Sequence, residues 1–334
     1  MPDLLAITGL AVSYGEAPAR AEIVRGVDLA VGEGEVVGLV GESGCGKTTA
    51  LLAVLGLLPR ARARVDGSVR FCGQELVGAK EAELARLRGG QIGAIFQNAR
   101  GALHPMRTVG AQIARAIRRH RSLAASAAHD EAIEAFRLAG FPDPDTIVHR
   151  YPHQLSGGQC QRAMIAIALS LRPRLVLADE PTSGLDVTVQ DQVLEMLAQR
   201  VSVTGTSLLL VSHDLDVIGR MCDRVAVMYA GMIVEEGAAR DVLDQPRHPY
   251  TRGLIASLEV DQGRLGSIPG SVPDPRIRIP GCPFANRCAH VEELCTSELP
   301  PLVRIDESTQ SARCVLYGPR AGAAGGSGGR VARC

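Results

Sequence analysis

A glycine-rich segment at residues 41–48 constrains the fold of this 334-residue chain more than any other stretch. Its sequence, GESGCGKT, fits the pattern G-x-x-x-x-G-K-[ST] at every fixed position. The apolar run at residues 36–40 before it predicts a buried parallel strand, and residues 49–55 after it predict a helix. A strand, a glycine loop and a helix in this order predict an α/β unit whose loop wraps around a phosphate group.

The residues of this loop are suited to hold the phosphates of a nucleotide and a Mg²⁺ ion. Glycines let the backbone amides approach a phosphate closely, Lys47 adds a point charge, and Thr48 offers a hydroxyl to Mg²⁺. Lys47 is one of only two lysines in the chain, and a planar guanidinium would not replace its compact ammonium. We expect nucleotide contacts from Gly41, Ser43, Gly44, Cys45, Gly46, Lys47, Thr48 and Thr49.

Two neighbouring carboxylates follow a second apolar run, at residues 175–178. Acids at the end of a buried strand need a cation or a water molecule beside them. In P-loop ATPases the first acid holds Mg²⁺ and the second orients and deprotonates the attacking water, which assigns Asp179 to the metal and Glu180 to the base. The alternative is a solvated turn ahead of Pro181.

The order of the motifs resembles that of an ABC-type ATPase over about residues 1–260. Besides the phosphate loop and the two acids, the motifs are Gln97, LSGGQ at residues 155–159, SGLD at residues 183–186, and His213. The resemblance implies that two such domains pair head to tail, with each ATP between the phosphate loop of one domain and the LSGGQ of the other. Ser156, Gly157, Gly158 and Gln159 would then serve the ATP of the partner.

The resemblance also implies roles for the other site residues. Gln97 would touch Mg²⁺ or water, His213 would reach the γ-phosphate, and Asp186 would link the two sites across the pair. Tyr14 would stack on adenine, although a tyrosine in a strand is more often a packing residue. The expected catalytic set is therefore Glu180, His213 and Gln97, and the expected Mg²⁺ set is Thr48, Gln97 and Asp179.

Changes in periodicity predict the domain organisation of this α/β, P-loop NTPase fold. Alternating strands and helices predict a parallel core sheet, and strand-rich stretches at 3–32 and 65–75 predict an antiparallel β edge subdomain. Residues 107–150 have helical spacing, with Ile113, Ile117, Phe136 and Leu138 on the expected apolar face, inside a helical insert at about 99–158. We predict a nucleotide-binding domain at 1–238, a small Cys-rich C-terminal extension at 239–317 and a flexible tail at 318–334.

Three segments of the extension resemble the ATPase subunits of oligopeptide and dipeptide ABC importers. They are QPRHPYTR at 245–252, IPGSVP at 268–273 and GCPF at 281–284. The resemblance implies three kinds of partner: a second homologous ATPase subunit, two transmembrane permease subunits, and an extracytoplasmic substrate-binding protein. It also implies a place at the cytoplasmic face of the cell membrane. Nickel importers share these features, so peptide and nickel both stay open as the cargo.

Four of the nine cysteines fall close together in the extension, at Cys282, Cys288, Cys295 and Cys314. Their spacing lacks the paired C-x2-C knuckles of a zinc ribbon, whereas a [4Fe-4S] cluster needs only four converging thiolates. Peptide-importer ATPases similar to this chain include members with such a cluster, so we expect a [4Fe-4S] cluster here. Zinc and unligated thiols are the alternatives.

Composition gives no sign of nucleic acid as a partner. The formal net charge is zero and the isoelectric point is about 7.1, without the basic excess of nucleic-acid binders. ABC ATPases that act on DNA or ribosomes share the LSGGQ motif, but a long heptad insertion and a second ATPase domain are missing from this sequence. No apolar run reaches 18 residues and the first residues lack a basic stretch, so we expect neither a membrane span nor a signal peptide.

Overall fold

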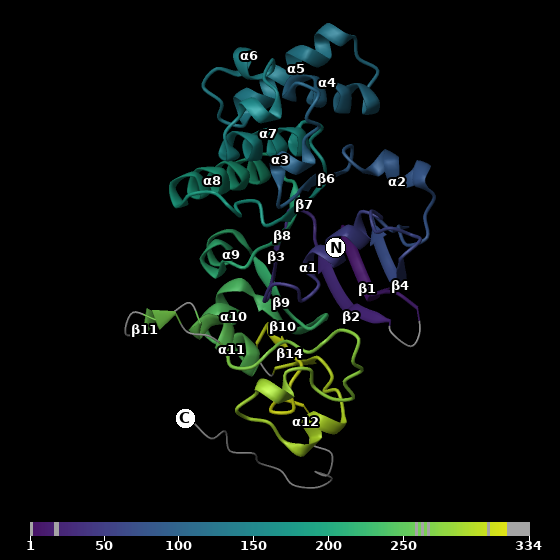
Figure 1. Ribbon diagram of the computed structural model, residues 1–334, viewed down its shortest axis with the longest axis vertical. Helices are drawn as coiled ribbons and strands as arrows, with labels where there is room; N and C mark the ends of the chain where they lie inside the picture. Colours follow the sequence, from purple (N-terminus) through teal and green to yellow (C-terminus); the bar gives the residue numbers. More distant parts are fainter. Residues whose placement is uncertain are drawn as a thin grey trace.

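The computed structural model describes residues 3–16, 20–257, 260–261, 264–265, 268–305 and 308–318. Two sheets with helices around them make up most of this part of the chain (Figure 1). The strands are β1 (Leu5–Tyr14), β2 (Ala21–Val31), β3 (Val36–Val40), β4 (Ala63–Phe71), β5 (Gln74–Glu75), β6 (Ile92–Ile95), β7 (Leu175–Asp179), β8 (Ser207–Val211), β9 (Arg224–Tyr229), β10 (Met232–Ala238), β11 (Val260–Asp261), β12 (Arg264–Leu265), β13 (Val303–Arg304) and β14 (Ser311–Ala312). The helices are α1 (Lys47–Val54), α2 (Glu81–Leu87), α3 (Ala99–Ala102), α4 (Val109–His120), α5 (Ala125–Leu138), α6 (Pro144–Ile147), η1 (Pro152–Gln154), α7 (Gly157–Leu169), α8 (Val187–Thr204), α9 (Leu215–Met221), α10 (Ala239–Asp244), α11 (Pro249–Ala256), η2 (Ala285–Arg287) and α12 (Glu293–Ser297).

The larger sheet has the strand order β13-β14-β10-β9-β3-β8-β7-β6. Strands β9, β3, β8, β7 and β6 are parallel, and β10 pairs antiparallel with β9. Every residue of β7 and β8 is buried, as their unbroken apolar runs require of strands covered on both faces. The predicted parallel core is therefore confirmed, and so are its strands at residues 36–40, 175–178, 208–211 and 225–229.

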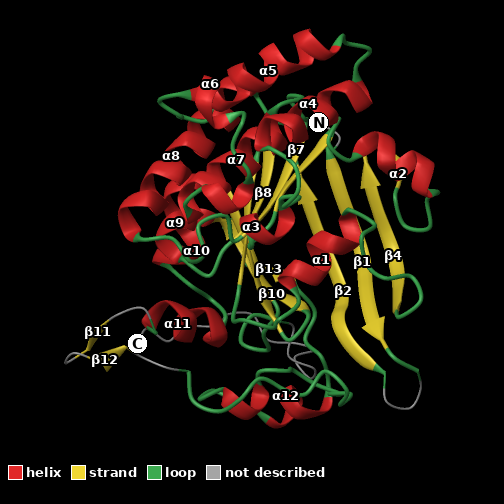
Figure 2. Cartoon of the chain, turned by 45° about the horizontal axis from the view of Figure 1, so that its top comes forward, coloured by secondary structure: helices red, strands yellow, loops and turns green. Residues whose placement is uncertain are grey.

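The smaller sheet is antiparallel, in the order β2-β1-β4-β5, which confirms the predicted edge sheet. Its buried side chains form one hydrophobic core with α1 and with one face of the larger sheet. Helix α1 lies beside strands β1 and β2 of the smaller sheet (Figure 2). Alternation along each core strand divides the side chains between two cores: Leu39 and Leu177 face this one, while Val40 and Val176 face the other. Helix α1, and with it the phosphate loop, is thereby held between the two sheets.

Helices α3 to α6 and the short helix η1 lie between β6 and α7 in the sequence and form the upper part of Figure 1 with α7 and α8. The predicted helical stretch is confirmed, and Ile113, Ile117 and Phe136 are fully buried as expected. The placement of Leu138 on the apolar face is wrong, because this side chain is 40 % exposed. Helix α5 buries Ala128, Ala132 and Phe136 instead, at spacings of four residues.

The described residues after β10 pack against the rest of the fold. Strand β14 pairs with β10 and so continues the larger sheet, with Glu235 opposite Ala312 and Glu236 opposite Ser311. Tyr250 and Phe284 belong to the same hydrophobic core as the parallel strands. The segment around α12 (yellow in Figure 1) lies below the sheets. The predicted tail at 318–334 lies outside the described residues from 319 onward.

Candidate functional site

The phosphate loop joins β3 to α1 and follows a path that glycine permits. Gly41 has a φ of 153°, and a Cβ there would lie 2.1 Å from the carbonyl oxygen of Met228. Gly46 has a φ of 108°, and a Cβ there would lie 2.6 Å from the carbonyl oxygen of Ile23. No larger residue fits between the loop and strands β9 and β2. Both fixed glycines of the motif are thus explained by close backbone approach.

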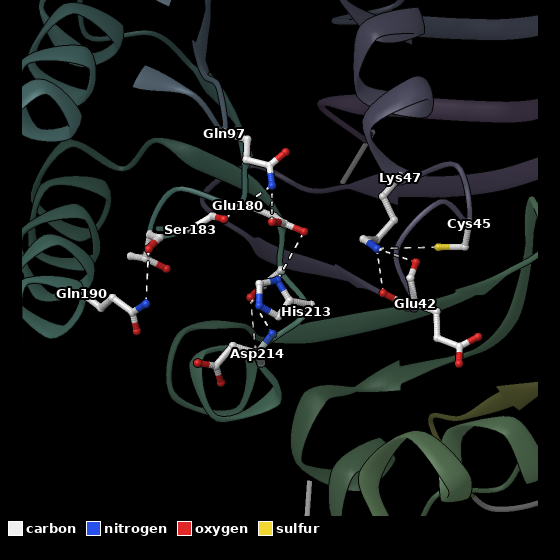
Figure 3. Close-up of polar contacts among 12 residues, drawn as sticks. Glu42, Cys45, Lys47, Gln97, Glu180, Ser183, Gln190, His213 and Asp214 are labelled. Carbon is white, nitrogen blue, oxygen red and sulfur yellow. Dashed lines mark hydrogen bonds and ion pairs between the residues drawn. The ribbon is translucent and has the colours of Figure 1, made fainter. Parts of the chain in front are cut away.

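Lys47 is the first residue of α1 and its side chain bends back over the loop. Only 5 % of Lys47 is exposed. The ammonium donates to the carbonyl oxygens of Gly41 at 2.6 Å and Glu42 at 3.0 Å, and lies 3.7 Å from Cys45 Sγ (Figure 3). Helix α1 begins without a side-chain cap, so its first amides are available to an anion. A buried cation and uncapped amides in one loop make a site for phosphate.

Asp179 ends β7 and fits the role of a cation ligand. It is 5 % exposed, and its Oδ1 atom has no hydrogen-bond partner among the described residues. Burial raises the pKa of this carboxyl, and the hydroxyl of Thr48 and the charge of Lys47 oppose that rise. An unpartnered buried carboxylate oxygen beside the hydroxyl of Thr48 is the donor set that Mg²⁺ prefers. The residues present therefore fit a Mg²⁺ ion.

Glu180 lies at the centre of a polar cluster formed by three neighbouring strand ends. Gln97 Nε2 donates to Glu180 Oε2 at 2.7 Å, and His213 Nδ1 lies 3.3 Å from Glu180 Oε1 (Figure 3). Gln97, Glu180 and His213 follow β6, β7 and β8, which are adjacent in the sheet. The carboxyl ends of parallel strands meet at one edge, where ligands of α/β sheets bind. The structure thus brings together the three residues that the sequence proposes for catalysis.

The backbone at Glu180 is held in a costly conformation. Its φ is 45°, in the left-handed region that non-glycine residues seldom adopt. The Glu180 amide donates to the carbonyl of Val211 at 2.9 Å, and its carbonyl accepts from the amide of Ser183 at 3.1 Å. Such a conformation costs about 1–2 kcal/mol, which these contacts offset. The turn points the Glu180 carboxylate toward Gln97 and His213.

The LSGGQ segment begins helix α7. Ser156 Oγ accepts from the amide of Gln159 at 3.2 Å, and Gln159 Oε1 accepts from the amide of Ser156 at 3.0 Å. This reciprocal capping holds an exposed serine and glycine at the helix start. A Cβ at Gly158 would lie 2.6 Å from Val189 Cγ1, so the segment lies against the start of α8. Among the described residues, no hydrogen bond joins Ser156, Gly157, Gly158 or Gln159 to the phosphate loop.

The remaining predicted residues have local contacts. Asp186 caps α8, and its Oδ1 accepts from the amide of Val189 at 3.1 Å. Tyr14 ends β1, is partly buried and packs against the core beneath the smaller sheet. Ser43, Gly44 and Thr48 are exposed and Thr49 is partly buried. The roles of Asp186 in coupling two sites and of Tyr14 in stacking on adenine stay predictions.

The four clustered cysteines line one small cavity with His248 and His290. Burial, together with the neighbouring cysteines, raises the pKa of the Cys282 thiol to about 11. All cysteines within the described residues are free thiols. Thiols are chemically suited to iron or zinc, although no three His, Cys, Asp or Glu side chains in the described ranges form a ligand group for a metal ion.

Sequence reasoning missed one contact of the phosphate loop. The carboxylate of Glu42 pairs with the guanidinium of Arg287, in the C-terminal part of the chain. The two residues are 245 positions apart, and neither belongs to a motif that predicts the contact. The one signal in the sequence for this contact was the acidic residue Glu42 in a loop that binds an anion. A carboxylate beside a phosphate needs a cationic partner.

The parallel sheet, the phosphate loop and the acids at its edge define a P-loop NTPase. The family model for ABC transporter matches residues 24–183, and that for the oligopeptide/dipeptide transporter C-terminal region matches residues 234–295. The chain is 40 % identical to the oligopeptide transport ATP-binding protein AppD of Bacillus subtilis over 95 % of this chain and 98 % of AppD. It belongs to the family of ABC transporter ATP-binding proteins.

Two further comparisons agree with this assignment. The dipeptide transport ATP-binding protein DppD of Bacillus subtilis is 40 % identical over 96 % of this chain and 97 % of DppD. A solved structure, a dimeric ATP-binding cassette in a post-hydrolysis state bound to ADP and phosphate, matches with a TM-score of 0.64 and 26 % identity. The match covers 71 % of this chain and 99 % of that chain. Within the described residues, no helix has the length and apolar character that a membrane span needs.

Proposed function

We propose that this chain hydrolyses ATP to power the import of dipeptides or oligopeptides through a membrane ABC transporter. The observation that carries the proposal is the match of residues 234–295 to the oligopeptide/dipeptide transporter C-terminal region, together with the phosphate loop and Glu180 in one chain. The relatives AppD and DppD are named as oligopeptide and dipeptide transport proteins. Nickel stays the alternative cargo, but neither of these names favours it.

In the proposed mechanism, some residues of the site bind the nucleotide and others carry out its hydrolysis. Lys47 and the loop amides bind the β- and γ-phosphates, and Thr48 and Asp179 would hold Mg²⁺, which neutralises phosphate charge. Glu180 orients the attacking water and accepts its proton. Gln97 and His213 hold the two carboxylate oxygens of Glu180 and would move toward Mg²⁺ and the γ-phosphate when ATP binds.

The proposal includes a partner for each ATP site. Ser156 and Gly157 of the LSGGQ segment are exposed, and the side-chain hydrogen bonds of Ser156 and Gln159 stay within the start of α7, which favours a role toward another subunit. The related cassette is dimeric. We propose a homologous ATPase subunit as the partner, two permease subunits above the pair, a substrate-binding protein on the far side of the membrane, and a position at the cytoplasmic face. We also propose the domain boundaries expected from the sequence, in which the helical insert ends at Gly157 and Gly158.

Co-expression with candidate permease subunits tests the proposal. We expect the chain to co-purify with two integral membrane subunits, and its ATPase rate to be low alone and higher in the complex. Full turnover by the isolated chain, or salt-sensitive binding to nucleic acid, would favour the rival class of soluble ABC ATPases that act on DNA or ribosomes.

We also propose a [4Fe-4S] cluster at Cys282, Cys288, Cys295 and Cys314. Support comes from the shared cavity of these four thiols, although their present arrangement forms no ligand group. No step of ATP hydrolysis is derived through a cluster. Iron and acid-labile sulfide analysis of protein purified without oxygen tests the proposal, and zinc without iron would contradict it.

A further inference from the structure

An ion pair joins the phosphate loop to the described residues after residue 238, here called the C-terminal segment. Arg287 Nη1 lies 2.8 Å from Glu42 Oε2, and Arg287 Nη2 lies 3.0 Å from Glu42 Oε1. The Arg287 side chain is 3 % exposed and that of Glu42 is 26 % exposed. A guanidinium that meets both oxygens of one carboxylate fixes its orientation as well as its charge.

Hydrogen bonds to several residues hold the Arg287 guanidinium in one orientation. Its Nε donates to the carbonyl of Pro269 at 2.8 Å, Nη2 donates to the carbonyl of Ile268 at 3.0 Å, and Nη1 donates to the Tyr229 hydroxyl at 3.2 Å. With the two bonds to Glu42, all five guanidinium donors have an acceptor. The guanidinium also lies over the rings of Tyr229, at 5.7 Å, and Phe284, at 5.8 Å.

Glu42, the partner of Arg287, is the second residue of the phosphate loop. Its amide donates to the Tyr250 hydroxyl at 2.8 Å, and its carbonyl accepts from the Lys47 ammonium at 3.0 Å. In Figure 3 the Glu42 carboxylate points away from Lys47. The residue therefore contacts the phosphate-binding lysine through its backbone and the C-terminal segment through its side chain and its amide.

A brace is useful to this loop because its glycines allow the backbone more conformations than other residues would. Gly41, Gly44 and Gly46 all have positive φ, and Ser43 and Gly44 are exposed. Glycine loses the most backbone freedom when it is ordered, so an unbraced loop would lose that freedom on binding phosphate. A loop that is already ordered binds its ligand more tightly.

We propose that Arg287 is a positioning residue for the phosphate loop, and that the C-terminal segment thereby sets the affinity for ATP. This inference rests on the proposed ATPase function for its ligand. The C-terminal segment would thus contribute to nucleotide binding, and this contribution would not depend on the cargo, on the permease subunits or on a metal at the cysteines.

The first test is Arg287→Gln in the full chain, with a fluorescent ATP analogue and Mg²⁺ as the probe. We expect the Kd for the analogue to rise about tenfold, since pairs in contact couple by that order. KM for ATP should rise in proportion while kcat at saturating ATP changes little, because Arg287 has no contact with Gln97, Glu180 or His213. Arg276→Gln is the matched control: Arg276 forms an exposed pair with Asp274 in the same segment and should leave the Kd unchanged.

A double-mutant cycle with Glu42→Gln separates positioning from general damage. If the ion pair carries the effect, the double variant should bind the analogue no more weakly than the weaker single variant. Arg287→Lys keeps the positive charge but cannot meet both carboxylate oxygens of Glu42, so its Kd should lie between those of the natural chain and Arg287→Gln. It also replaces Arg287→Gln in the test if that variant does not fold. An unchanged Kd in a folded Arg287 variant, or fully additive losses in the cycle, would overturn the inference. These measurements need no membrane partner, so a failure of peptide import would leave them standing.

Discussion

Glu180 shows how one residue is prepared for chemistry by its surroundings. Its left-handed backbone turns the side chain out of the strand direction, and Gln97 and His213 each engage one carboxylate oxygen. The Glu180 side chain is 17 % exposed, whereas that of His213 is 65 % exposed. The carboxylate is therefore already sheltered, while His213, like the exposed Gln97, has room to move toward a bound nucleotide.

We expect Glu180→Gln to slow ATP hydrolysis by about 10²–10⁴-fold without loss of ATP binding, because the amide keeps the shape of the side chain and cannot accept the proton of water. Phosphate release and binding of a fluorescent ATP analogue measure the two properties. Glu195→Gln, an exposed glutamate on α8, should keep the normal rate. Unchanged hydrolysis in the Glu180 variant would show that another group acts as the base.

The candidate site was predictable wherever its chemistry lies in short motifs. The phosphate loop and the acids at 179 and 180 sit beside apolar runs that specify their own strands. Arg287 was not predictable, because its partner is 245 positions away and the contact depends on how the C-terminal segment packs. The contact between Arg287 and Glu42 is therefore visible only in the folded structure and not in any local sequence pattern.

Caps at helix starts recur at the functional elements. Ser156 caps α7, Asp186 caps α8, and His248 caps α11 by accepting from the amide of Tyr250 at 3.0 Å. The cap at His248 requires a neutral Nδ1, and the side chain is almost completely buried. Burial lowers the pKa of His248 from its usual value near 6.5 to about 3. The start of α11 is therefore sensitive to acid.

The lowered pKa of His248 makes the folded protein less stable at low pH. The unfolded chain binds a proton at His248 below about pH 6.5, and the folded protein resists it down to about pH 3, so stability falls as the pH drops through that window. Between pH 7 and 5.5 we expect His248 to remove about 1 kcal/mol from the free energy of unfolding. Urea unfolding at both pH values measures it.

The variant His248→Asn keeps a capping oxygen without a titrating ring and should lose less stability between the two pH values. Glu235 contacts the His248 amide and has a pKa raised by burial, so its own contribution has the opposite sign and is common to both proteins. Equal losses of stability in the two proteins would show that His248 does not resist protonation.

At the level of elements, the sequence specified what local patterns control. Strands β3, β7 and β8 follow from uninterrupted apolar runs, and α4 and α5 follow from helical spacing. Leu138 was misplaced because α5 buries Ala128, Ala132 and Phe136 on one face, and Leu138, two positions after Phe136, lies on the opposite side of the helix. The two-residue strand β14 had no signal of its own, because its pairing is set by β10.

The whole molecule depends on its last described residues to complete the larger sheet. Strand β14 covers the edge of β10, and Gln310 beside it is 1 % exposed. The Gln310 amide donates to the carbonyls of Asp241 and Gln245 at 2.9 Å and 3.0 Å, and its oxygen accepts from Arg247 at 3.0 Å. This one side chain therefore joins the residue before β14 to helix α10 and the residues that follow it.

We expect a chain that ends at residue 302 to self-associate, because it leaves the edge of β10 unpaired and the contacts of Gln310 unmade. Size-exclusion chromatography over a range of concentrations measures the association. A chain that ends at residue 318 keeps every contact described here and should run as the full-length protein does. A monomeric chain that ends at 302, with an unchanged melting temperature, would contradict the expected role of β14.

The ion pair between Glu42 and Arg287 also has a consequence for how the protein is made. Synthesis runs from the N-terminus, so a growing chain carries residues 41–48 long before residue 287 exists. Until residue 287 has been made and has packed, the loop would be present without its brace and would bind ATP more weakly. A growing chain would then compete less well for ATP than one in which Arg287 has reached Glu42.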